Sequence, residues 1–182
     1  PENTLPAFEL ALQQGADGVE LDVKLTSDGH VIVMHDPTVD RTTDGHGRVR
    51  DLSLADFRKL DAGGWYSETY RGTKVPTLDI VFETIGRRCV INVELTNYTT
   101  PRDALVEKVC ALVERHALQD RILFSSFFAG NLKKAAALLP SVPRGLLALD
   151  GWKGAWARSF GFMFGDYQAM HPYITDVNAP QV

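Results

Sequence analysis

The sequence predicts a single α/β domain over residues 1–182 with parallel strands, and three observations lead to this expectation. Short apolar runs with the two-residue period of strands alternate with segments of helical periodicity, a pattern typical of parallel sheets. A length of 182 residues suits one domain rather than two. Apolar residues make up 45% of the chain and charged residues 23%, so a disordered or collagen-like chain is excluded.

The N-terminal part of the chain predicts a helix followed by two strands. We expect a helix that Thr4 caps and Gly15 ends, because apolar side chains recur there at three- and four-residue spacing. The segment 17–23 alternates apolar and acidic residues, which predicts a strand. An Asp-Gly turn at 28–29 then leads into a second strand over 31–35.

A polar stretch comes next, and after it helices and strands alternate regularly. Residues 37–52 are rich in Thr, Asp and Gly, so we interpret them as an excursion from the core. Ser53 and Asp56 have the spacing of a capping box at the start of a short helix over 53–60. The later elements are expected to be a helix from Thr77 to near Gly86, helices from Pro101 and over 131–139, and strands over 89–95, 121–126, 144–149 and 167–171.

Three acidic residues lie on predicted strands among apolar neighbours. Glu20 and Asp22 are two positions apart and therefore point to the same side of their strand, and Glu94 has a similar place in the strand over 89–95. Buried carboxylates repel one another and lose hydration, so they need a cation. A site made only of oxygen ligands suits Mg²⁺ or Ca²⁺ rather than zinc. Alternatively, the acids face solvent on an antiparallel sheet, or they pair with the nearby bases Lys24, Arg87 or Arg88.

A histidine at the end of the second strand is a candidate for proton transfer. His35 ends the apolar run VIVMH and is followed by Asp36. Histidine titrates near neutral pH, so it can act as a general acid or base. The alternative is a core or capping histidine bonded to a backbone carbonyl group.

The segment 151–167 concentrates aromatic residues among glycines. It contains two Trp, three Phe and one Met, and it is too short and interrupted to cross a bilayer. One interpretation is a helix packed on the outside of the fold. The other is a lid or hydrophobic mouth that meets an acyl chain, or a contact between subunits. A homo-oligomer or lipid contact through 151–167 therefore stays open.

Charge, hydropathy and cysteine content exclude several classes of protein. A net charge of −4 argues against a nucleic-acid binder, which usually needs a basic face. No run approaches the roughly 18 apolar residues of a transmembrane segment. Cys89 and Cys110 lie in apolar runs and are expected to be buried thiols, which is compatible with the reducing cytoplasm, where we place the protein. Motifs of P-loop NTPases, α/β-hydrolases and zinc fingers are not found.

Several motifs resemble those of the glycerophosphodiester phosphodiesterase family. PENT opens the chain, GADGVELDV covers the first acidic strand, and HDP, RTTDGHGRV and VPTL follow in the family's order. INVEL resembles the family's next acidic barrel strand, and SSF resembles the strand after it. The resemblance runs from Pro1 to about Phe127.

This resemblance implies a TIM-type (β/α)₈ barrel with a small insertion after the second strand, over 36–75, of which the chain holds about five barrel strands. It implies a phosphoric diester hydrolase that converts glycerophosphodiesters, as small-molecule substrates, to glycerol 3-phosphate and an alcohol. The residues to which it assigns roles are Glu20, Asp22 and Glu94 as ligands of one Mg²⁺ or Ca²⁺ ion, His35 as a catalytic residue, and Thr96 and Phe127 as substrate contacts.

The chain departs from the family's pattern in three ways. The family's His-Arg-Gly motif, which holds the partner of His35, is expected upstream of Pro1, and the closing strands are expected beyond Val182. Thr96 stands where the family usually has Lys, which weakens phosphate neutralisation unless another group supplies the charge. Two alternatives therefore accompany the main hypothesis. One is a lysophospholipid-directed phosphodiesterase, suggested by 151–167, and the other is a catalytically silent barrel that binds phosphodiesters.

Overall fold

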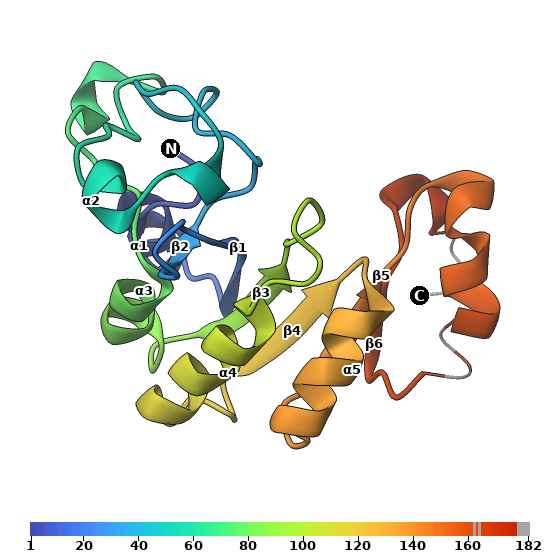
Figure 1. The fold of residues 1–182 in the computed structure, drawn as a ribbon. Coiled ribbons are helices and arrows are strands. Elements are labelled where there is room, and N and C mark those ends of the chain that lie inside the picture. Colours follow the sequence, from blue (N-terminus) through green and yellow to red (C-terminus); the bar gives the residue numbers. More distant parts are fainter. Residues whose placement is uncertain (162, 164, 178–182) are drawn as a thin grey trace.

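A six-stranded, mostly parallel sheet lies at the centre of the protein in the computed structural model, which describes residues 1–161, 163 and 165–177 (Figure 1). The strand order is β2-β1-β3-β4-β5-β6; β2 is antiparallel to β1, and every other neighbouring pair is parallel. The strands are β1 (Gly18–Leu25), β2 (Val31–Val33), β3 (Val90–Leu95), β4 (Ile122–Ser126), β5 (Arg144–Leu147) and β6 (Ala169–His171). The predicted α/β class with parallel strands is confirmed.

Four helices cover one face of this sheet. Along the sheet, α1 packs beside α3, α3 beside α4, and α4 beside α5 (Figure 1). These helices are α1 (Leu5–Gln13), α3 (Leu78–Ile85), α4 (Leu105–His116) and α5 (Ala129–Leu138), whereas the short α2 (Leu54–Phe57) lies between β2 and α3. Short helical turns also form at Val49–Asp51, Glu68–Tyr70, Gly151–Gly154, Ala157–Gly161 and Ile174–Asp176.

The main core lies between the sheet and these helices. Because side chains alternate along a strand, Leu21 and Val23 of β1 point to the same face, and Leu21 lies opposite Val93 of β3. All three are fully buried, as is Phe124 of β4 in the next row. Cys89 and Cys110 are buried, free thiols of this core, as expected. The other face of the same strands is left for polar side chains.

The whole segment between β2 and α3, called the excursion from here on, has a smaller core of its own. Ile32 and Met34, in and just after β2, pack with side chains of the excursion, and Phe57 of α2 is the largest of these. The members of this second cluster are Ile32, Met34, Val39, Val49, Phe57, Ala62 and Val75. That residues 36–75 are a small insertion within the domain stays a prediction. The second cluster supports this prediction.

Two of the three predicted helix caps form as expected. Ser53 and Asp56 make the capping box, each side chain accepting from the other residue's backbone N–H. The hydroxyl of Thr77 accepts a hydrogen bond from the Ile80 N–H at 3.3 Å. The prediction for Thr4 is wrong at the level of the side chain, because its hydroxyl donates to the Pro1 carbonyl oxygen at 2.6 Å and caps no helix N–H.

Several predicted elements are shorter in the structure, for local reasons. The strand over 31–35 ends at Val33, because His35 turns away to contact Asp36. The short helix after Ser53 ends at Phe57 rather than at residue 60. The helix expected from Pro101 begins at Leu105. The Leu105 N–H donates a hydrogen bond to the Asp103 carboxylate at 3.0 Å.

The segment 151–167 lies beyond the β5–β6 edge of the sheet (Figure 1). It forms short helical turns, and its side chains are largely open to water: Trp152 is 85% exposed and Trp156 is 61% exposed. The interpretation as a helix packed on the outside of the fold holds only in part, because the segment is a series of short turns of which Ala157 and Tyr167 pack against the main core. Phe162 and Phe164, also part of the predicted segment, lie outside the described residues. Within the described chain, we find no helix with the length and apolar character that crossing a membrane requires.

Candidate active site

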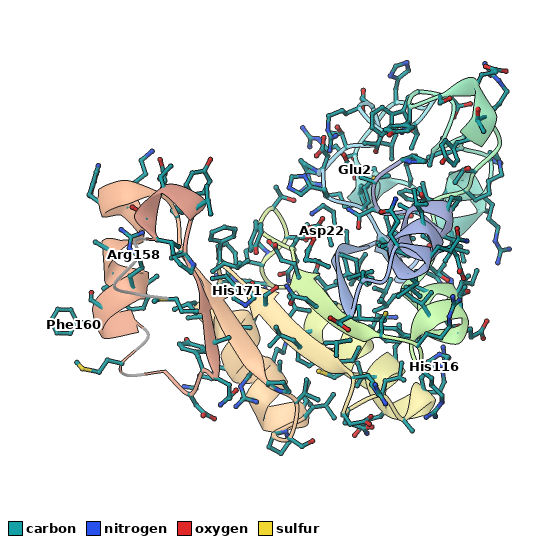
Figure 2. The ribbon with its side chains drawn as sticks, turned by 180° about the vertical axis from the view of Figure 1, so that it is seen from behind. Glu2, Asp22, His116, Arg158, Phe160 and His171 are labelled. Carbon is teal, nitrogen blue, oxygen red and sulfur yellow. The ribbon has the colours of Figure 1, made fainter. Side chains whose placement is uncertain are left out.

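Three carboxylates meet on the polar face of β1 and β3. The strand register sets Asp22 directly opposite Glu94, and Glu20 lies two residues before Asp22 on the same face. One carboxylate oxygen from each of the three residues lies within 4.8 Å of the others. Asp22 and Glu2 are labelled in Figure 2, where both lie on the side of the sheet toward the excursion. The structure therefore brings the three predicted ligands together; their metal role stays a prediction.

The ionised forms of Glu20 and Glu94 are disfavoured at this place. Desolvation, together with the charges of Asp22 and Glu94, raises the pKa of Glu20 to about 8, although much of this residue's surface is open to water. Burial likewise raises the pKa of Glu94, and the hydrogen bond from Tyr98 opposes this rise. Three negative charges at one place are therefore unfavourable without a counter-ion. All the donor atoms are carboxylate oxygens, so the chemistry of the cluster fits a hard divalent cation such as Mg²⁺ or Ca²⁺.

Two residues that sequence reasoning missed orient these acids. Asn3 donates through Nδ2 to Asp22 Oδ2 at 3.0 Å, and its Oδ1 accepts the Asp22 N–H at 3.3 Å. Asn3 adopts this place with φ of 54°, a left-handed conformation that Asn tolerates better than most residues. The Tyr98 hydroxyl donates to Glu94 Oε1 at 2.8 Å. Asn3 lies in the PENT motif and Tyr98 shortly after the INVEL motif, but neither stands on a strand where alternation gives the direction of a side chain.

A lysine lies directly beyond the carboxylates. Lys24 follows Asp22 by two residues on β1, and its Nζ donates to Thr96 Oγ1 at 2.7 Å and to the Thr96 carbonyl oxygen at 3.0 Å. The Thr96 hydroxyl itself donates to the Val23 carbonyl oxygen at 2.8 Å. Thr96 is thus buried, and its hydroxyl group both donates and accepts a hydrogen bond. The group that it holds at the site is the ammonium group of Lys24. Its predicted contact with substrate stays untested.

The alternative interpretation, in which the three acids pair with Lys24, Arg87 or Arg88, is not found among the described residues. Arg88 pairs with Glu9 at 2.6 Å, and Arg87 donates to the His116 carbonyl oxygen. Lys24 binds Thr96 rather than a carboxylate.

His35 is held by a chain of charged groups. Its Nδ1 lies 2.7 Å from Asp36 Oδ1, and Asp36 also accepts hydrogen bonds from Arg41. Arg41 in turn bonds both oxygens of Glu2. The hydrogen bond with Asp36 raises the pKa of His35, and the Arg41 guanidinium keeps the pKa of Asp36 well below its usual range. The imidazole is 63% exposed, and Nε2 makes no hydrogen bond within the described part of the chain.

The remaining predicted site residue, Phe127, is linked to the cluster through Tyr98. The Phe127 N–H donates to the Tyr98 hydroxyl at 3.0 Å, and the two rings meet edge to face with centroids 5.8 Å apart. Phe127, Phe128 and Trp156 line a cavity of about 480 Å³. The predicted role of Phe127 in substrate binding stays untested. Other histidines lie away from the acids: His116 ends α4 and contacts Asp79 at 2.6 Å, and His171 is on β6 (Figure 2).

Comparison with known proteins shows the family to which the chain belongs. The chain is 37% identical over 178 residues to a glycerophosphodiester phosphodiesterase of Caldanaerobacter subterraneus subsp. tengcongensis, covering 97% of this chain and 72% of that protein. It is 39% identical over 152 residues to a glycerophosphodiester phosphodiesterase of Bacillus altitudinis, covering 82% of this chain and 62% of that protein. The chain thus spans between about three fifths and three quarters of these relatives.

A solved structure shows the same fold. The structure of an Oleispira antarctica phosphodiesterase, in complex with the product sn-glycerol-3-phosphate, matches with a TM-score of 0.86 and 33% identity, covering all of this chain and 73% of that one. The fold is accordingly of the TIM-barrel type, and the described strands form part of the barrel. The profile of the glycerophosphoryl diester phosphodiesterase family matches residues 1–172. The chain therefore belongs to the glycerophosphoryl diester phosphodiesterase family, a family of phosphoric diester hydrolases.

Proposed function

We propose that this chain hydrolyses glycerophosphodiesters to glycerol 3-phosphate and an alcohol, with one Mg²⁺ or Ca²⁺ ion held by Glu20, Asp22 and Glu94. The observation that carries the proposal is the meeting of three carboxylates from two parallel strands within 4.8 Å, at a site where two of them have raised pKa values. Family membership supports the reaction class, and the related structure with bound sn-glycerol-3-phosphate supports the product.

The chain's own residues divide the chemistry among them. The cation, when bound, polarises the phosphate and lowers the pKa of an attacking or substrate hydroxyl group. Lys24 places a positive charge one step beyond the carboxylates, where it neutralises phosphate charge in place of the lysine that Thr96 replaces. Nε2 of His35 is the atom that transfers the proton. As a general acid it donates the proton to the leaving alkoxide, and as a general base it accepts one from the nucleophile. Asp36 favours the charged imidazole and fixes its orientation through Nδ1.

The test is the hydrolysis of glycerophosphocholine by the full chain with and without EDTA. Glu20→Gln, Asp22→Asn and Glu94→Gln are each expected to lower turnover at least about 10³-fold, because a Lewis acid supplies several kcal/mol of transition-state stabilisation. His35→Ala is expected to lower it by about 10²-fold or more. Glu114→Gln, an exposed acid of α4, is the matched control and should leave turnover unchanged.

Calorimetric titration with Mg²⁺ and Ca²⁺ separates the metal role from other roles of the acids. The three acid variants should lose metal binding, whereas His35→Ala should keep it. Turnover that survives all three acid changes, or that EDTA leaves intact, would contradict the metal assignment. Binding of glycerophosphocholine without any hydrolysis would instead favour the silent binding barrel.

A lysophospholipid-directed activity is the second candidate, and exposed aromatic side chains favour it. Trp152 and Trp156 stand open to water, and Trp156 also lines the cavity beside Phe127 and Phe128. A long-chain lysophosphatidylcholine would place its acyl chain against this surface. Faster turnover of that lipid than of glycerophosphocholine, lost in Trp156→Ser, supports this candidate. Equal loss on both substrates refutes it. Concentration-dependent light scattering of the same variant tests a subunit contact instead.

A further inference from the structure

A separate cavity of about 270 Å³ opens beyond the carboxylates, between the ends of β1 and β3 and the excursion. Its volume is below the roughly 300–1,000 Å³ of sites for drug-sized ligands, so it suits a small group. Its positively charged lining residues are Lys24, Arg48 and Arg50, and the threonines Thr38, Thr96, Thr99 and Thr100 also line it. No carboxylate belongs to this lining, as far as the described residues show.

The charges in this cavity are available to a ligand. Arg48 forms no ion pair within the described part of the chain. Arg50 lies 3.8 Å from Asp51, but both are widely open to water, which makes the pair weak. Lys24 is bonded to neutral oxygens of Thr96. Three cations therefore gather around one small space in a protein whose net charge is −4.

The cavity is also placed correctly for a second group on the same substrate. Lys24 lies two residues beyond Asp22 on one strand, a separation of roughly 6.6 Å at the usual rise per residue. A diester whose scissile phosphate is held at the carboxylates, with its alcohol moiety directed past Lys24, brings that moiety to the arginines. Guanidinium groups bind phosphate oxygens in pairs, so Arg48 and Arg50 suit a phosphate better than a neutral or cationic headgroup.

We propose that Arg48 and Arg50, which line this cavity beyond Lys24, bind a second anionic group on the alcohol moiety, so that the chain prefers glycerophosphodiesters whose alcohol carries a phosphate. This inference rests on the proposed function, since it names the substrate class of the same site.

The experiment compares two substrates that differ by one phosphate: glycerophosphoglycerol, and the same diester with a phosphate on its terminal hydroxyl group. The wild-type chain is expected to have a kcat/KM about tenfold higher for the phosphorylated diester. Arg48→Ala/Arg50→Ala should abolish this preference and leave glycerophosphoglycerol turnover unchanged. Arg48→Lys/Arg50→Lys keeps the charge and should retain part of the preference. Arg58→Ala, an exposed arginine outside the cavity, is the control.

A binding measurement in EDTA makes the result independent of turnover. Under that condition the phosphorylated diester should bind wild-type protein about tenfold more tightly than glycerophosphoglycerol, and the difference should shrink as salt is raised. Equal kcat/KM and equal binding of both diesters overturn the proposed cavity role. A preference that persists in Arg48→Ala/Arg50→Ala overturns the assignment to the arginines. No hydrolysis of either diester, with the binding preference intact, overturns the proposed function and leaves the cavity role standing.

Discussion

The two faces of β1 and β3 use the same strand alternation for different purposes. Toward the helices, Leu21, Val23 and Val93 are fully buried among other apolar side chains. On the opposite face, Asp22 is also buried, yet it is satisfied by hydrogen bonds with Asn3, and Lys24 is held by Thr96. Burial of an apolar side chain contributes to stability by itself, whereas a buried charge persists only with a partner. The helix-facing side therefore supports the fold, and the other side supports the chemistry.

The largest effect should come from a cavity in the helix-facing side. Leu21→Ala is expected to lower the free energy of unfolding by about 2–5 kcal/mol, because Leu21 is fully buried and its neighbours cannot collapse completely. Urea denaturation followed by circular dichroism measures this. Leu10→Ala, at a position 44% exposed, should cost far less. A similar loss at both positions would erase the distinction between core and surface.

The next effect concerns charge on the polar side. Lys24→Ala is expected to lower kcat/KM for glycerophosphocholine by about 10- to 100-fold, because a charged hydrogen-bond donor is removed from the phosphate. Adding Thr96→Lys should restore part of the activity, since Thr96 directly follows β3 and its Oγ1 lies 2.7 Å from Lys24 Nζ. Circular dichroism must show both variants folded. Failure of Thr96→Lys to restore any turnover would mean that Lys24 has a purely structural role.

A smaller effect is a displaced pH profile. Asp36→Asn removes the carboxylate charge whose hydrogen bond with Nδ1 raises the pKa of His35, so that pKa should fall. The limb of the kcat/KM profile that reports His35 then moves to lower pH, whether His35 acts as acid or as base. Asp40 contacts His46 rather than His35, so Asp40→Asn should leave this limb of the pH profile in place. An unmoved limb in Asp36→Asn would separate His35 from the titration that governs the rate.

The smallest effect should be a gain in stability. The pKa of Glu20 is raised to about 8 in the folded protein from 4.5, so the folded state binds more protons than the unfolded state between these values. Stability of the metal-free protein should therefore fall as pH rises through this window. Glu20→Gln should flatten this dependence and raise Tm at pH 8 by about 2–4 °C, a gain of only about 1 kcal/mol because water screens the exposed carboxyl. A lower Tm for Glu20→Gln would contradict this account.

Alternation along a strand was the part of the site that the sequence could predict. It gave the common face of Glu20 and Asp22, and the apolar flanks of Glu94 indicated a third acid on a parallel neighbour. The bond between Lys24 and Thr96 could not be predicted, since it depends on which residues the register sets side by side.

Contacts between segments far apart in the chain were equally out of reach. Arg41 contacts both Asp36 and Glu2, the latter 39 residues away in the chain, and no local pattern contains that link. The failed cap at Thr4 has a local cause instead, because the carbonyl oxygen of Pro1, three residues earlier, accepts from the hydroxyl group. Local rules choose among the partners that lie close in sequence, and the fold adds others.

The small second core around Phe57 has a consequence for how this enzyme can diversify. It anchors the excursion through Ile32 and Met34, while the strand ends that bear the carboxylates belong to the main sheet. The part of the excursion around Arg48 and Arg50 can therefore be exchanged while Arg41, which holds Asp36 beside His35, is kept. Grafting residues 44–52 of other phosphodiesterases onto this scaffold is a direct test of whether this part of the excursion sets headgroup choice.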